Sequence, residues 1–168
     1  MATLNPSPAF WRPAALPLFT GLVALLGAAD GVFNLAKPES GAATFGLVPP
    51  RRDPPTPSQF DAFHHALVKV KGARNLHMSS CVLALVVYGQ FSAACRASPE
   101  AAVAVRRCAG IVLTLGAGVG FSGAAIVAEY LRSPDASAEA VEVGIAKVKA
   151  HLLTNVPIVA LGLVYLFY

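Results

Sequence analysis

Three ionisable residues, Asp30, Arg74 and Glu129, fall within stretches of the sequence that are otherwise apolar. Ionisable groups at membrane depth are costly, and they persist mainly where they pair or carry out chemistry. A buried carboxylate favours its protonated form unless a nearby cation restores the anion. Two carboxylates with an arginine between them can therefore hold different protonation states, as a general acid and a general base acting together require. We predict that Asp30, Arg74 and Glu129 form a catalytic set of this kind.

Other polar residues recur at helical spacing close to these three. The period of three to four residues places Asp30 with Asn34, and His151 with Asn155, on single stripes of their helices. The same period puts Lys147 on the stripe of His151. Any one of these residues often serves only to hold helices together by hydrogen bonds, so the prediction depends on their convergence. The predicted residues for positioning substrate or water are Asn34, Lys71, Asn75, His77, Tyr130, His151 and Asn155.

Other kinds of catalytic site lack the residues or the spacing that they need. The serines next to His77 have no evident acidic third partner for a nucleophilic triad. Among the histidines, His64 and His65 point about 100° apart on a helix, and no two histidines are spaced i, i+4. We therefore predict neither a metal site nor a cofactor.

The composition predicts a membrane protein. Charged residues make up 13% of the chain and hydrophobic residues 55%, and the mean hydropathy is +0.60; a soluble domain has about 25% charged residues. The net charge is +4, but the basic residues are scattered rather than clustered with aromatic ones, which argues against a nucleic-acid partner. The cysteines show no metal-ligand spacing and are expected to act as small apolar residues.

The apolar stretches are long enough to cross a bilayer, which takes about 20 residues. We predict a single transmembrane domain over residues 1–168, of the all-α class. Its helices are expected at residues 14–36, 61–91, 99–131 and 138–168. Because the last two connections are short, an up-down-up-down four-helix bundle is the simplest topology. The segment Lys37–Phe60 is rich in proline and is predicted to be a long loop without a continuous helix.

Two short motifs resemble a known family. The turn Ala29-Asp30-Gly31 and the run from Val70 to Leu76 (VKGARNL), together with the chain's size and its four expected spans, resemble the small fungal integral-membrane proteins of polyketide gene clusters. Some members act as epoxide hydrolases or cyclases in pathways of the aurovertin and citreoviridin kind. The resemblance implies a cofactor-free enzyme of the endoplasmic-reticulum membrane. Where an acidic residue often follows the motif arginine, this chain has Asn75, which leaves Asp30 and Glu129 as the acid-base candidates.

The leading hypothesis is therefore a membrane-embedded epoxide hydrolase or cyclase that opens an epoxide on a lipophilic polyketide-type substrate. Its partners would be this small molecule and membrane lipid. One alternative is a non-enzymatic membrane protein that binds a lipophile or serves in assembly, and another is a sterol or terpenoid isomerase that uses the same residues. The sequence leaves open whether the chain forms a homo-oligomer.

Overall fold

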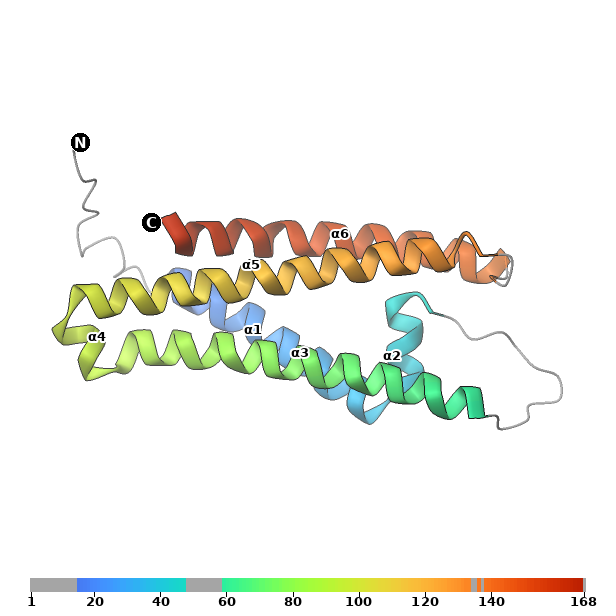
Figure 1. Cartoon of the computed structure of the whole chain (residues 1–168), viewed down its shortest axis with the longest axis horizontal. Helices are drawn as coiled ribbons and strands as arrows, with labels where there is room; N and C mark the ends of the chain where they lie inside the picture. Colours follow the sequence, from blue (N-terminus) through green and yellow to red (C-terminus); the bar gives the residue numbers. More distant parts are fainter. Residues whose placement is uncertain (1–14, 48–58, 134–135, 137, 168) are drawn as a thin grey trace.

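The computed structural model describes residues 15–47, 59–133, 136 and 138–167, and over these residues it contains helices and no strand. The helices are α1 (Ala15–Ala36), α2 (Pro38–Phe45), α3 (Gln59–Phe91), α4 (Ala93–Ala97), α5 (Pro99–Tyr130) and α6 (Ala138–Phe167) (Figure 1). The predicted all-helical class is thus confirmed for the described part of the chain.

The long helices α3, α5 and α6 lie close to the long axis of the molecule, and α1 runs obliquely to them (Figure 1). The most extensive contacts join α1 to α3 and α5 to α6, and the contact between α3 and α5 connects the two pairs. The short helix α2 lies across this arrangement and touches both α3 and α6. Side chains from the α1–α3 pair and from the α5–α6 pair can therefore line the same interior space.

The ends of α5 and α4 follow from capping residues in the sequence. Ser98 accepts a hydrogen bond from the backbone N–H of Ala101 at 3.2 Å, and Pro99 occupies the first turn, where no N–H donor is needed. Ser92 caps α4 in the same way by accepting from the N–H of Ala94 at 3.1 Å. These two serines separate α3, α4 and α5 at a sharp reversal of the chain.

Helix α2 corrects the prediction of a loop over Lys37–Phe60. Pro38 stands in the first turn of α2, where its missing N–H costs nothing, and Glu39 lies near the positive end of the helix dipole. The helix ends at Gly46, whose φ of 96° is a left-handed conformation that favours glycine. The other prolines of this segment come later, and residues 48–58 of the predicted loop lie outside the described residues.

Three of the helices, α1, α5 and α6, are long and apolar enough to cross a membrane. Their large apolar side chains point outward: Leu18, Leu115 and Leu153 are each more than 60% exposed, as lipid-facing residues would be. Helix α3 is not in this group, because its first half carries Lys69, Lys71 and Arg74. The prediction that α3 is a fourth span stays a prediction.

Glycines let the helix backbones touch within both pairs. A Cβ atom on Gly31 of α1 would lie 2.8 Å from the carbonyl oxygen of Gly72 in α3, and a Cβ atom on Gly110 of α5 would lie 2.8 Å from the carbonyl oxygen of Gly162 in α6. Small residues at such crossings permit the close approach that stabilises helix pairs in lipid. The Gly31–Gly72 contact lies directly beside the polar residues of the candidate site.

Candidate functional site

A cavity of about 470 Å³ lies between the long helices and is bordered by α2. Apolar side chains line one part of it, among them Val82, Val112 and Ile158. Polar and charged side chains line the rest: Asp30, Thr44, Lys71, Arg74, Asn75, Ser79, Lys147, His151, Thr154 and Asn155. This mixture of an apolar wall and converging polar groups is typical of small-molecule sites.

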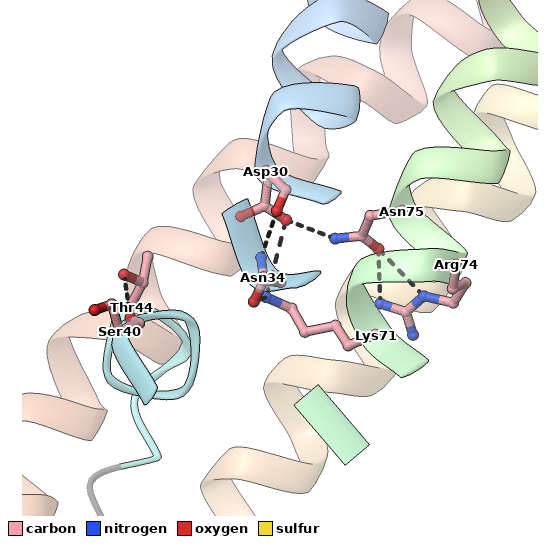
Figure 2. A network of polar contacts seen from close by, with 7 residues as sticks. All are labelled: Asp30, Asn34, Ser40, Thr44, Lys71, Arg74 and Asn75. Carbon is pink, nitrogen blue, oxygen red and sulfur yellow. Dashed lines mark hydrogen bonds and ion pairs between the residues drawn. The ribbon is translucent and has the colours of Figure 1, made fainter. Parts of the chain in front are cut away.

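Asp30 is at the centre of the polar contacts in this cavity (Figure 2). The side-chain amide of Asn75 donates a hydrogen bond to Asp30 Oδ2 at 2.7 Å. Lys71 Nζ lies 3.9 Å from the same oxygen. The contact of α1 with α3 at Gly31 and Gly72 holds both helices close enough for these interactions. Asp30 is therefore fixed in place by one neutral donor and one cation.

Lys71 connects Asp30 to two further residues. Its Nζ donates to Asn34 Oδ1 at 3.1 Å and lies 4.5 Å from the centre of the Phe45 ring, a cation–π contact. Asn34 is almost completely buried and donates from its own amide to the backbone oxygen of Asp30 at 2.6 Å. The lysine is thereby held between α1, α3 and α2 with its charge next to the carboxylate.

Arg74 lines the cavity, but it does not contact Asp30 directly. Its Nε and one Nη donate to Asn75 Oδ1 at 3.2 and 3.0 Å, and its side chain is exposed (Figure 2). Asn75 thus lies between the carboxylate and the guanidinium, with its nitrogen bonded to Asp30 and its oxygen bonded to Arg74. The predicted direct pairing of arginine with carboxylate is replaced by an amide bridge.

Glu129 does not join Asp30 and Arg74, contrary to the predicted geometry. It is exposed and does not line the cavity, as is also true of Ser122 and Ala125 on the same stripe of α5. The stripe that faces inward instead contains the buried Val127 and the cavity-lining Gly120. Glycine and alanine are spread over all sides of α5, so the sequence offered little contrast from which to choose the inner face.

Two of the predicted positioning residues also lie away from the cavity. His77 is exposed and its Nδ1 is hydrogen bonded, at 2.7 Å, to the backbone oxygen of Ala73 in its own helix. Tyr130 lies at the end of α5 and does not line the cavity. Neither residue is brought into contact with Asp30.

Helix α6 supplies His151 and Asn155 to the cavity. The His151 ring packs against Phe45, with 4.6 Å between ring centroids. In the described part of the chain, its Nε2 atom is buried and has no hydrogen-bond partner. Asn155 donates to the backbone oxygen of His151 at 2.7 Å, and its side chain fills the space over Gly120. His151 therefore lines the α6 side of the cavity and carries a buried nitrogen without a hydrogen-bond partner among the described residues.

Several cavity residues were missing from the predicted set, and Phe45 and Lys147 are the two that matter most for the contacts described above. Phe45 contacts Lys71 and His151, but it was assigned to the proline-rich loop; the signal that could have found it is Pro38 at the start of a short helix and Gly46 after its end. Lys147 lies on the predicted polar stripe of α6 and lines the cavity. Among the described residues, no group of three histidines, cysteines or carboxylates is placed to hold a metal ion.

Comparison with known proteins places the chain in a family. The model of a domain of unknown function, DUF4267, matches residues 24–165. The chain belongs to the DUF4267 family. No curated protein and no solved structure gives a significant match. The DUF4267 match includes Asp30, Lys71, Asn75 and His151, so both sides of the cavity lie within the family domain.

Proposed function

We propose that this DUF4267 protein is an integral-membrane epoxide hydrolase or cyclase that acts on a lipophilic polyketide-type epoxide. The main observation in support is that the Asp30 carboxylate, fixed by Asn75 at 2.7 Å, faces a largely apolar cavity together with His151. A carboxylate and an imidazole carried by different helices are suited to act as a base and an acid on one substrate. Glu129, which is exposed and does not line the cavity, has no part in this proposal.

In the proposed reaction, Asp30 takes a proton from water as the water oxygen attacks one carbon of the epoxide. The bond between that carbon and the epoxide oxygen breaks, and His151, when protonated, gives its proton to that oxygen. The proton taken up by Asp30 then returns to His151 through solvent, which restores both groups. The product of hydrolysis is a diol, and the overall change is the addition of one water molecule. In a cyclase, a hydroxyl group of the substrate replaces the water and a cyclic ether forms.

The neighbouring residues have supporting roles in this proposal. Lys71 Nζ lies 3.9 Å from Asp30 Oδ2 and donates to Asn34, and it thereby helps to hold the carboxylate in position. Asn75 orients Asp30 through its hydrogen bond and is itself held by Arg74. Asn155 keeps α6 close to α5 by packing over Gly120, which sets the position of His151.

We also propose that α3 is a fourth crossing helix and that the chain forms an up-down four-helix bundle in the endoplasmic-reticulum membrane. The second half of α3 presents Val87, Tyr88 and Phe91 outward, each more than 50% exposed. Of the polar residues that lower its hydropathy, Lys71 and Asn75 contact α1, whereas Lys69 and Arg74 are exposed. Polar groups that face other helices rather than lipid are tolerated within membrane spans.

The test is turnover of a lipophilic polyene epoxide by detergent-purified protein in isotopically labelled water. We expect wild type to give a labelled diol, or an unlabelled cyclic ether if it is a cyclase, and Asp30→Asn to give neither. Glu142→Gln is the matched control, because Glu142 is an exposed carboxylate on α6 that does not line the cavity. Equal turnover by wild type and Asp30→Asn would contradict the proposal.

One observation favours a second function, the binding of a lipophile without chemistry. Asp30 already has two partners, Asn75 and Lys71, and such contacts also occur in structural networks. In that case Asp30→Asn would lower the thermal midpoint of unfolding sharply, and an epoxide would bind without being converted. Measuring melting and turnover on the same variant separates the two functions.

A further inference from the structure

Positive charge exceeds negative charge among the described residues that line the cavity. Lys71, Arg74 and Lys147 are cations, whereas Asp30 is the one carboxylate among them. Asp30 lies beside Lys71. Within the described part of the chain, Arg74 and Lys147 are therefore left without a carboxylate partner. Both cations line the cavity without a carboxylate partner among these residues, so an anionic group of a bound ligand would be attracted to them.

These two cations come from opposite sides of the cavity and have donors to spare. Arg74 on α3 donates from Nε and one Nη to Asn75 Oδ1, and its other Nη makes none of the hydrogen bonds drawn in Figure 2. The side-chain carbons of Lys147 on α6 pack beside Gly46: a Cβ atom added to Gly46 would lie 3.0 Å from Lys147 Cβ. A guanidinium and an ammonium group together can bind a carboxylate or a phosphate through charge-assisted hydrogen bonds.

The cavity extends away from these cations into an apolar region. Along α3 it is lined from Lys71 to Val82, and along α6 from Lys147 to Ile158. At the usual helical rise each of these stretches corresponds to about 16 Å. Val112 and Leu113 of α5 complete the apolar end. The site is thus elongated, with cations at one end and aliphatic side chains at the other.

We infer that the ligand of this cavity is an anionic amphiphile, a molecule with an apolar chain and a carboxylate or phosphate at one end. The inference rests on the proposed function only in taking this cavity as the substrate site. The acidic group binds between Arg74 and Lys147, and the chain extends toward Val82 and Ile158. In an epoxide substrate of this class, the anionic end would anchor the molecule while Asp30 acts on the chain.

The inference is tested on wild-type protein in nanodiscs of zwitterionic lipid, with binding measured by calorimetry for three probes of equal chain length. We expect dodecanoate to bind at least tenfold more tightly than dodecanol, because the acid adds a charge-assisted interaction. Dodecylammonium should bind more weakly than dodecanol. Equal affinities for the acid and the alcohol would overturn the inference, and epoxide opening on neutral substrates would still be tested separately by turnover.

Variants then locate the anionic group. Lys147→Met and Arg74→Gln should each reduce the preference for dodecanoate over dodecanol about tenfold, with the affinity for dodecanol unchanged. Lys149→Met is the matched control, since Lys149 is exposed on the same helix and does not line the cavity. An equal loss in Lys149→Met would contradict the assignment to Lys147.

A last comparison identifies the source of the amphiphile. Repeating the dodecanoate titration in nanodiscs that contain phosphatidylglycerol tests whether a membrane lipid occupies the same site. If phosphatidylglycerol weakens dodecanoate binding to wild type but not to Lys147→Met, the inference is supported with an anionic lipid as the ligand. Unchanged dodecanoate binding would support it with a free acid as the ligand.

Discussion

Each of the two helix pairs has a close glycine contact, Gly31 with Gly72 at one end of the molecule and Gly110 with Gly162 at the other, but the side chains around the two contacts differ. Around Gly110 and Gly162, the cluster of Ala24, Val82, Ala109, Leu113, Leu161 and Tyr165 is closely packed. A polar pair beside this cluster, the hydroxyls of Thr20 and Tyr165 at 2.9 Å, is buried. Around Gly31 and Gly72, the neighbouring groups are instead Asp30, Lys71 and Asn75 beside an open cavity. Helix packing alone therefore does not explain the charged end.

The difference between the apolar and the charged helix crossing indicates which residues serve stability and which serve function. Apolar packing would stabilise the crossing of α1 and α3 at least as well as a network of charges, because removing charges from water is costly. The apolar end shows that the same chain can make such a crossing without them. The charges at the other end are consistent with a role toward a ligand, and variants at the two ends should therefore affect different measurements.

The largest expected effect in this comparison, after that of Asp30, comes from His151. His151→Gln removes the proposed proton donor, and turnover of the lipophilic epoxide should fall about a hundredfold or more. The thermal midpoint should fall only modestly, because the ring contact with Phe45 is lost whereas the buried Nε2 atom has no hydrogen-bond partner among the described residues. Turnover and melting measured on one preparation check this, and undiminished turnover would remove His151 from the mechanism.

A smaller effect is expected from opening the helix crossing at each end. Gly72→Ala and Gly110→Ala both place a methyl group within 3 Å of backbone atoms, and each should destabilise the protein by about 1–3 kcal/mol. Only Gly72→Ala should also reduce turnover, by about tenfold, because it moves Asn75 away from Asp30. A similar loss of turnover in both variants would show that the two ends are not functionally distinct.

The smallest effect is expected at the apolar end. Tyr165→Phe removes the hydroxyl that pairs with Thr20 and should cost about 1 kcal/mol of stability. Turnover should stay at the wild-type level, since Tyr165 does not line the cavity. Melting curves and initial rates check this prediction, and a large loss of rate would connect the apolar end to the chemistry.

The sequence predicted the helices well because their ends carry strong local signals. Ser98 and Pro99 start α5 near the predicted position, and the long apolar runs of α1 and α6 identify them as membrane-capable. Helix α2 was missed because proline was read as a breaker throughout its segment, whereas Pro38 occupies the one place in a helix where it is favourable.

The candidate site was predicted in part for a related reason. Asp30, Lys71 and Asn75 converge as expected because glycines next to them, Gly31 and Gly72, define the contact face of α1 and α3. No comparable marker exists near Glu129, where small residues surround α5 on every side. The facing of that helix depends on packing with α6, which no local pattern in the sequence determines.

The central claim, that the cavity around Asp30 rather than the predicted pair with Glu129 holds the chemistry, is tested most directly by comparing Asp30→Asn with Glu129→Gln. Both variants remove one carboxylate charge and keep the shape of the side chain. Their rates of epoxide opening would be measured in labelled water, with melting curves to confirm that both are folded. We expect Asp30→Asn to lose at least a hundredfold in rate and Glu129→Gln to match wild type. Full activity in Asp30→Asn, or an equal loss in both variants, would contradict the account.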